Sequence, residues 1–338
     1  MYLHSSLVFD PVPSPINGAE FNTSSTETTA IITLMQGYDL CLAWNWEYDA
    51  DFSHLLEAAC QRYGISFYSV KPENVGQVLA DLERADLSFK AFFDRASESD
   101  RRFQPLVDWA SHHSLFCINP QKQTLWAVDK ATMHLEFVSH GLDTPHTILL
   151  PPFVDHPGIP AHDLSPLGGS FAIKPASMGG GEGVVLTATL WEQVLAVRQQ
   201  HPGEKYLLQA LGTPQMLEGR PAWFRVLVCD GALYPCWWNP GTHIYSPVTA
   251  EQRFRFGLRT LRDIASRIAQ ICRLQLFSTE IAMTGAGRFL VVDYVNDPVD
   301  LRLQSRAFDG APDIYVESIA ARLVRLVQAH RAKRIVEG

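Results

Sequence analysis

Residues Phe171–Val185 read FAIKPASMGGGEGVV and form the most informative stretch of the sequence. Three apolar residues lead into Lys174, a glycine-rich loop follows, and an apolar run resumes at Val184. Glycine is favoured where backbone N–H groups approach phosphate oxygens too closely for a Cβ atom, and a lysine supplies a point charge to the same oxygens. The stretch therefore predicts a strand carrying a lysine, a phosphate-covering loop and a return strand. The candidate loop glycines are Gly179, Gly180, Gly181 and Gly183.

The order of residues in this stretch excludes two common phosphate-binding motifs. In the phosphate loop Gly-x-x-x-x-Gly-Lys-Ser/Thr the lysine follows the glycines, whereas here Lys174 precedes them. A dinucleotide-binding fingerprint needs a helix directly after its glycines, and no helical pattern begins there. A glycine hairpin with an incidental lysine remains the alternative from this stretch alone, so the rest of the chain must decide.

Composition restricts the class of protein. A chain of 338 residues with 46% hydrophobic content can bury a large core in two or three lobes. Its net charge of -8 argues against a nucleic-acid-binding protein and against a basic membrane-surface protein. The six cysteines form no Cys-x-x-Cys pair, which favours buried free thiols in a reducing compartment. No apolar run approaches ~18 residues and no secretion signal is visible, so we expect a cytoplasmic protein without a membrane span.

The N-terminal third alternates short apolar runs with helical periodicity. Over residues 37–119 this β-α-β pattern predicts a small lobe with a parallel sheet, whereas residues 1–36, rich in Ser, Thr, Pro and Asn, predict a loosely held arm. Ligands of parallel sheets lie beyond the carboxyl ends of strands. Polar residues follow two of these strands. They either contact the substrate, or they are solvated loop residues that include a local Asp–Arg pair. The candidate residues there are Glu47, Asp49 and Arg95.

Two longer helices are predicted further along the chain. Residues 123–140 predict one helix that contains Asp129 and Lys130, and residues 250–274 predict one long amphipathic helix. Between them, Arg225 lies in the middle of the apolar run WFRVLVCDG, the first strand of a predicted hairpin. An arginine there would be costly to bury without a partner, which favours a functional role. His243, in the aromatic loop after the hairpin, is a weaker candidate for substrate contact.

A second informative stretch, FSTEIAMTGAGRFLVVDYVNDPVDLR, predicts two antiparallel strands that hold Glu280 and Asp293, with Asn296 following. Two carboxylates and an amide at neighbouring strand ends make an oxygen site suited to Mg²⁺ that bridges phosphates. Asp293 and Asn296 are three residues apart, so a regular strand would point them to opposite faces. A bulge near Val295 would bring both to the metal. Alternatively, Glu280 and Asp293 alone bind it.

The order of these features resembles that of the ATP-grasp superfamily over about residues 37–330: the lysine helix, the lysine strand with its glycine loop, the arginine strand and the metal hairpin. The resemblance implies an α+β ATP-grasp fold, in which two α/β lobes sandwich ATP, preceded by a small parallel α/β domain. It places the ATP-grasp domain at residues 120–331, with a central lobe at about 120–209 and a C-terminal lobe at about 210–331.

The resemblance also implies roles for individual residues. It assigns the phosphates to two lysines and the glycine loop, adenine to the hinge that ends the strand at 205–211, the ribose to a following carboxylate, and the substrate carboxylate to two arginines. The ATP-binding candidates are Lys130, Lys174, Gly179, Gly180, Gly181, Gly183, Gln209, Ala210, Leu211 and Glu218. The metal candidates are Glu280, Asp293 and Asn296, the catalytic candidates are Arg225 and Arg302, and the weaker substrate candidates are Arg95 and His243.

The implied activity is that of an ATP-dependent ligase. Such an enzyme joins a carboxylate to an amine, of amino-acid or peptide type, through an acyl phosphate, and releases ADP and phosphate. The implied cofactors are ATP and Mg²⁺, with Mn²⁺ as an alternative metal, and the implied partners are small-molecule carboxylate and amine substrates. A small-molecule kinase on the same fold and a non-catalytic nucleotide-binding regulator are the alternatives. A homodimer is left open.

Overall fold

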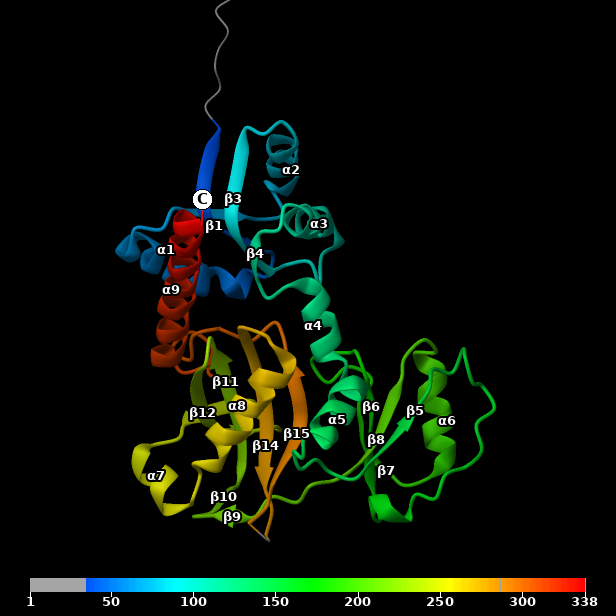
Figure 1. Ribbon diagram of the computed structural model, residues 1–338. Helices are drawn as coiled ribbons and strands as arrows, with labels where there is room; N and C mark the ends of the chain where they lie inside the picture. The colour runs from blue at the N-terminus through cyan, green and yellow to red at the C-terminus, as the bar shows by residue number, and fades with distance from the viewer. Residues whose placement is uncertain (1–34, 286, 338) are drawn as a thin grey trace, which may run out of the picture. The chain divides into compact units, whose positions relative to one another are not determined.

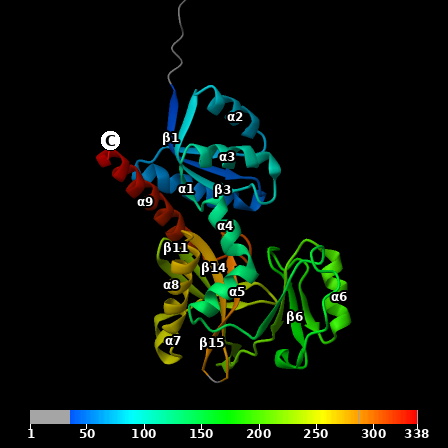
Figure 2. The ribbon, with the colours of Figure 1, turned by 45° about the vertical axis from the view of Figure 1, so that its right-hand side comes forward.

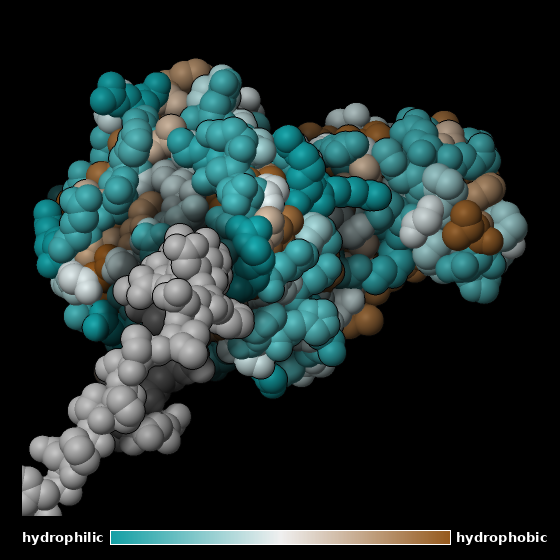
Figure 3. All heavy atoms as spheres, turned by 90° about the horizontal axis from the view of Figure 1, so that it is seen from above, coloured by the Kyte–Doolittle hydropathy of each residue, from teal (hydrophilic) through white to brown (hydrophobic). Residues whose placement is uncertain are grey.

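The computed structural model describes residues 35–285 and 287–337 (Figure 1). The predicted N-terminal arm therefore lies outside the described residues, apart from Met35 and Gln36, and Gln36 already belongs to the first strand. No described helix is both long and apolar enough to cross a membrane. The face shown in Figure 3 is mostly hydrophilic where the residues are described, with scattered apolar side chains.

The N-terminal domain contains a parallel sheet with strand order β2-β1-β3-β4. The connecting helices lie on its two faces, and each face packs a separate apolar core. The predicted parallel sheet is thus confirmed. The strands are β1 (Gln36–Trp44), β2 (Phe67–Val70), β3 (Leu87–Arg95) and β4 (Phe116–Ile118), and the helices are α1 (Ala50–Tyr63), α2 (Val75–Glu83) and α3 (Gln104–His112).

The central lobe contains an antiparallel sheet with strand order β5-β8-β6-β7. Its strands and α6 enclose one apolar core. The strands are β5 (Thr147–Leu150), β6 (Phe171–Pro175), β7 (Val185–Ala188) and β8 (Tyr206–Ala210), and the helix is α6 (Trp191–Gln200). The helices that precede β5, α4 (Gln121–Val128) and α5 (Lys130–Ser139), pack against β15 (Phe289–Asn296), and α5 also packs against α8 (Thr260–Cys272).

The single helix predicted over residues 123–140 is wrong. Asp129 has an extended conformation, with ψ 103, and separates α4 from α5. Its carboxylate accepts a hydrogen bond from the Thr132 N–H at 2.7 Å and so caps α5. Lys130 is consequently the first residue of α5, and its N–H donates to the Ala176 carbonyl at 2.8 Å.

The C-terminal lobe contains a five-stranded antiparallel sheet with strand order β13-β12-β11-β14-β15. A single helix predicted over residues 250–274 is wrong, because Gly257, with φ +66, lies between two separate helices. The strands are β9 (Met216–Leu217), β10 (Arg220–Pro221), β11 (Trp223–Cys229), β12 (Ala232–Asn239), β13 (Ile244–Pro247), β14 (Leu276–Met283) and β15 (Phe289–Asn296). The helices are α7 (Ala250–Arg255), α8 (Thr260–Cys272) and α9 (Asp313–Glu337).

Helices pack against this five-stranded sheet from two sides. Figure 2 shows α8 alongside the sheet and α9 extending from it towards α1. Helix α8 packs on one face, where its buried Leu261 and Ile268 join Phe224 and Ile281 in one core. Helix α9 packs on the other face and also against α1, so the N-terminal domain and the C-terminal lobe share a core. The domain boundaries drawn at residues 120 and 210 remain predictions.

A polar network joins the end of β4 to β14 and β15. The amide nitrogen of Asn119 donates to the Leu276 carbonyl at 2.7 Å and to the Asp297 carboxylate at 3.0 Å. The Thr124 hydroxyl donates to the same carboxylate oxygen at 3.1 Å. Burial nevertheless raises the pKa of Asp297 to about 6, because these donors compensate only part of the lost hydration.

We expect Asp297→Asn to stabilise the protein at neutral pH. The raised pKa means that the folded state favours the protonated form of Asp297. The stability that this carboxyl group contributes is therefore present below pH 3.8 and is lost as the pH rises towards 6. The amide oxygen of asparagine can accept both donors without a charge. In urea denaturation at pH 8, the free energy of unfolding of the variant should exceed that of the wild type by about 1–2 kcal/mol. This range allows for the residual solvent contact of Asp297. The gain should vanish below about pH 4, and a gain independent of pH would contradict this explanation.

Candidate active site

Three charged residues form a row across the C-terminal sheet. Arg225 on β11 lies directly opposite Glu280 on β14, which lies directly opposite Asp293 on β15. Residues directly opposite each other point to the same face of a sheet. Along β14, Leu276 on one side of the row belongs to the core shared with α9, and Ala282 on the other side belongs to a small apolar cluster. The charged row therefore lies between two apolar regions.

Arg225 and Glu280 are held by further polar and aromatic contacts. The Arg225 Nη1 atom lies 3.6 Å from Glu280 Oε1, and its Nε donates to the Ser278 hydroxyl at 3.1 Å. The guanidinium lies 4.8 Å from the centre of the Trp238 ring. The indole N–H of Trp223 donates to Glu280 Oε2 at 3.0 Å. Trp223 thus orients Glu280, a role that sequence reasoning missed although the two-residue spacing places Trp223 and Arg225 on one face.

Strand β15 contains the bulge predicted near Val295. Glu280 is paired with Asp293 and Ser278 with Asn296, so two steps along β14 correspond to three along β15. The extra residue restores the alternation, and the Asn296 side chain forms a hydrogen bond to the Asp293 carboxylate. The structure thus brings together all three residues predicted for the metal.

Two lysines from other elements reach the same region. The Lys174 ammonium on β6 donates to Gln209 Oε1 at 2.7 Å and to the Val292 carbonyl at 3.0 Å. The Lys174 side chain thus reaches from the central lobe to the backbone of β15, next to Asp293. The Lys130 ammonium donates to the Met178 carbonyl at 2.7 Å, at the start of the glycine loop.

Opposite charges in this region shift one another's pKa values. Burial raises the pKa of Asp293, but Lys130, Lys174 and Arg225 together bring it below its ordinary value. Burial also raises the pKa of Glu280, with Arg225 opposing the shift and Asp293 adding to it. The Lys174 pKa is lowered by loss of solvent, against the attraction of both carboxylates. The site thus holds an ionised aspartate beside a less acidic glutamate.

The glycine loop between β6 and β7 requires glycine at Gly183. Its φ is +68, and a Cβ atom there would lie 2.9 Å from Pro175 Cγ. At its other end, a Cβ on Gly179 would lie 3.9 Å from a carboxylate oxygen of Glu98, which belongs to the N-terminal domain. The loop therefore extends from the lysine strand to the segment that follows β3.

The three predicted hinge residues differ in what they offer a base. Gln209 is buried, and its side-chain oxygen accepts the hydrogen bond from Lys174. The Ala210 N–H donates to the His146 carbonyl at 2.9 Å. Leu211 is 44% exposed, and no described residue accepts its N–H. The next residue, Gly212, passes over the apolar cluster: a Cβ there would lie 3.7 Å from Val292. That cluster consists of Ala282, Leu290 and Val292.

Two of the predicted site residues, Glu218 and Arg302, form ion pairs with residues that were not predicted for the site. Glu218, in the turn between β9 and β10, forms an ion pair with Arg255 on α7, and no described contact joins it to the other candidates. Arg302 lies between two carboxylates, with its Nη2 atom 2.7 Å from Asp300 and 3.0 Å from Asp309. These carboxylates raise its pKa further and occupy most of its donors.

A cavity of about 380 Å³ lies where β1 and β3 end and where the chain leaves β15. Arg95 forms a two-point pair with Asp49, at 2.9 and 2.7 Å, while its Nη1 atom is buried without a partner among the described residues. Such an unpaired buried donor is costly, so a polar group brought next to it would be stabilising. The lining also includes Glu98, whose pKa is raised by burial and by Asp297.

Sequence reasoning missed Glu98, although it directly follows the segment expected to face ligands at the end of β3. Two other predicted substrate residues, Glu47 and His243, do not line this cavity. Glu47 is exposed. His243 is exposed and stacks on Trp238, with ring centres 5.4 Å apart.

The donor set fits a hard cation that is also bound by phosphates. Within the described part of the chain, no group of three His, Cys, Asp or Glu side chains could hold a metal by itself. Glu280, Asp293 and Asn296 offer oxygens only, and Mg²⁺ at phosphate sites commonly takes one or two carboxylates and completes its shell with phosphate and water.

Solved structures resemble the whole arrangement. D-cycloserine synthetase DcsG matches with a TM-score of 0.56 and 17% identity, over 85% of this chain and 99% of that one. A RimK domain ATP-grasp protein from Sphaerobacter thermophilus matches with a TM-score of 0.57 and 17% identity, over 85% and 99%. D-alanine–D-alanine ligase from Bacillus anthracis, complexed with ATP, matches with a TM-score of 0.59 and 9% identity, over 88% and 98%.

No protein-family model and no curated protein matches the sequence. At these low identities the likeness to solved structures establishes the fold, while the chemistry rests on the residues themselves. The matched structures cover most of this chain, 85% for the first and 88% for the last. The resemblance seen in the sequence is confirmed: the chain has the ATP-grasp fold, preceded by a small parallel α/β domain.

Proposed function

We propose that the protein is an ATP-dependent ligase that joins a carboxylate to an amine through an acyl phosphate. The observation that carries this proposal is the meeting of Lys130, Lys174 and Arg225 with Glu280 and Asp293. Phosphoryl transfer is catalysed mainly by positioning and by charge stabilisation around the transferred group. Cations for phosphate oxygens and carboxylates for a metal are the groups that this chemistry requires.

The nucleotide would lie between the central and C-terminal lobes. Lys130 and Lys174 bind its phosphates, and the loop Gly179–Gly183 covers them. The Leu211 N–H offers a hydrogen bond to the base, beside the apolar cluster of β14 and β15. Glu280, Asp293 and Asn296 hold Mg²⁺, which when bound neutralises charge on the phosphoryl oxygens.

The substrates would occupy the cavity beside the charged row. Arg225 orients the carboxylate, and Arg95, which lines the cavity, adds a second positive charge. Asp300, held in place by Arg302, and Glu98 lie at the cavity, where they attract an ammonium group. The chain has 28 basic against 36 acidic residues, which suits carboxylates and an amine better than a phosphate-rich acceptor.

The reaction then follows in two steps. A carboxylate oxygen attacks the γ-phosphorus, an O–P bond forms, and the bond to ADP breaks. The amine nitrogen, after losing its proton, attacks the acyl carbon, an N–C bond forms, and phosphate leaves with the former carboxylate oxygen. The glycine loop excludes water, which would hydrolyse the acyl phosphate.

Isotope transfer tests this sequence of steps. Substrates are first found by ADP release against a panel of amino acids and dipeptides, and the active carboxylate is then labelled with oxygen-18. We expect ADP and phosphate in equal amounts, with one labelled oxygen in the phosphate. A phosphoryl group retained on a stable product, with no free phosphate, would mean that the protein is a kinase instead.

A further inference from the structure

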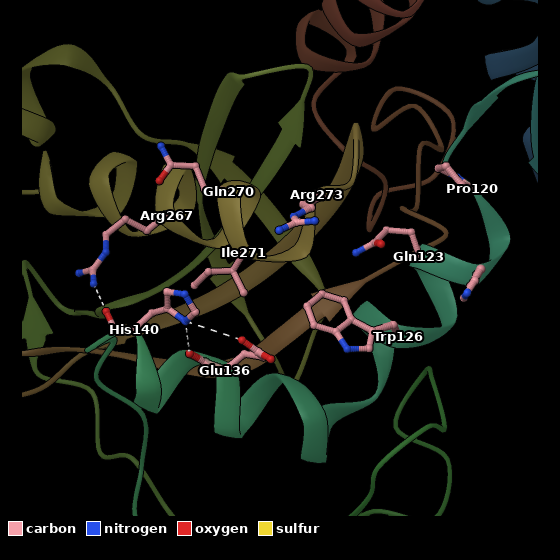
Figure 4. A pocket seen from close by; sticks show the side chains of 10 residues that line it. Pro120, Gln123, Trp126, Glu136, His140, Arg267, Gln270, Ile271 and Arg273 are labelled. Atoms are coloured by element: carbon pink, nitrogen blue, oxygen red, sulfur yellow. Dashed lines mark hydrogen bonds and ion pairs between the residues drawn. The ribbon is translucent and has the colours of Figure 1, made fainter.

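A second and larger cavity, of about 960 Å³, lies between the α4–α5 segment and α8 (Figure 4). None of the residues proposed for ATP, metal or substrate lines it. In Figure 4, Trp126 and Glu136 lie on the α4–α5 side, and Ile271 and Arg273 lie on the α8 side. The Gln123 side chain donates to the Cys272 carbonyl at 2.7 Å, which ties the two walls together. The cavity is therefore preformed and distinct from the candidate active site.

The lining of this cavity is cationic on a protein that is acidic overall. Lys122, Arg267 and Arg273 line it, and none of them forms an ion pair with a residue in the described ranges. Glu136 is the one carboxylate in the described lining, and it lies 3.7 Å from His140 Nδ1. Among the residues that the structure describes, the Arg267 guanidinium donates to the His140 carbonyl alone. Against a net charge of -8, this local excess of positive charge favours an anionic ligand.

Apolar side chains accompany these cations. Trp126 is 36% exposed at the cavity, and Ile271, 9% exposed, lies across from it. Trp126 and Ile271 thus add an apolar pair to the cationic lining of the cavity.

We propose that this cavity binds an acidic peptide segment of a partner polypeptide. Its carboxylates would meet Lys122, Arg267 and Arg273, and an aromatic or aliphatic side chain would lie against Trp126 and Ile271. The volume is at the upper end of the range of small-molecule sites, about 300–1,000 Å³. Because the lining combines three cations with Trp126 and Ile271, it suits a ligand that carries both carboxylates and an apolar side chain, which favours an acidic peptide over a small inorganic anion. The proposal does not depend on the ligase function.

Fluorescence anisotropy with two labelled hexapeptides tests this proposal. The acidic probe is Asp-Glu-Leu-Trp-Asp-Glu, and its uncharged counterpart is Asn-Gln-Leu-Trp-Asn-Gln. The full chain should bind the acidic probe at least about tenfold more tightly, and the difference should shrink as salt is raised. The double variant Lys122→Glu/Arg273→Glu and the variant Trp126→Ala should each weaken binding about tenfold. Arg62→Glu, at an exposed arginine of α1, is the matched control and should leave binding unchanged.

Several results would overturn the proposal. They are equal affinity for the two peptides, unchanged binding in the double variant, and absence of binding up to about 1 mM probe. If sedimentation shows a dimer that the double variant dissociates, while neither peptide binds, the occupant is a second copy of this chain and the proposal is wrong. Equal thermal unfolding midpoints for all variants show that the comparison concerns binding and not folding.

Discussion

Replacing Asp293 with asparagine is expected to lower turnover by at least about 10²–10³-fold while the fold is retained. Asparagine keeps the size of the side chain and its hydrogen bond with Asn296 but removes the negative charge. Lys130, Lys174 and Arg225 all stabilise that charge, which indicates that the site is built around an ionised group. ADP release under saturating ATP and Mg²⁺ measures the effect, and circular dichroism checks the fold.

Two further variants make this result specific. Asn296→Ala should also lower turnover, because the bulge of β15 brings Asn296 beside Asp293. Asp51→Asn, at a side chain that is 44% exposed and 4.0 Å from Arg306, should leave activity unchanged. Full activity in the Asp293 variant would show that the metal assignment is wrong.

Lys174→Met is the second change with a large expected effect. Methionine matches the length of the lysine side chain but cannot bind phosphate, so affinity for Mg·ATP should fall about 10–100-fold. The ammonium group is already held between Gln209 and the Val292 carbonyl, so little ordering is lost when ATP binds. Isothermal titration calorimetry measures the affinity directly, without any need for the acceptor substrates.

Lys90→Met is a suitable control for this variant. The Lys90 side chain is 52% exposed and pairs with Asp39, which keeps Arg331 as a second cation 3.1 Å away. Its ATP affinity should equal that of the wild type. Equal affinities for the Lys174 variant and the wild type would remove Lys174 from the nucleotide site.

The sequence predicted those features whose causes are local. The β-α-β rhythm of residues 37–119 predicted the parallel sheet, and the lysine-glycine stretch predicted the strand-loop-strand of β6 and β7. The odd spacing of Asp293 and Asn296 predicted a bulge, because side chains alternate along a regular strand. Each inference needed only a short window of residues.

Features set by distant partners could not be predicted in this way. Helical periodicity continues across Asp129, but the Lys130 N–H bonds to Ala176, a residue from another part of the chain, and the helix is broken there. Arg302 suggested a substrate-binding fork, and nothing in the sequence showed that both Asp300 and Asp309 would occupy it. The lack of a partner for the Arg95 Nη1 atom likewise depends on how the end of β3 packs against segments that are distant in the sequence, such as the one that holds Asp49.

The separate core of the central lobe has a consequence for how nucleotide can reach the site. Strands β5–β8 and α6 enclose apolar side chains that come only from residues 148–210, whereas the N-terminal sheet and the C-terminal lobe share a core through α9. Segments that share a core exchange their amide hydrogens in one cooperative opening, and segments with their own core can open at lower free energy. The side of the lobe that faces α6 can therefore open by itself. Ala176 and Leu207, on the side of Lys174, instead share the core of α5, α8 and the strands of the charged row, so Lys174 stays assembled with that row for the next molecule of ATP.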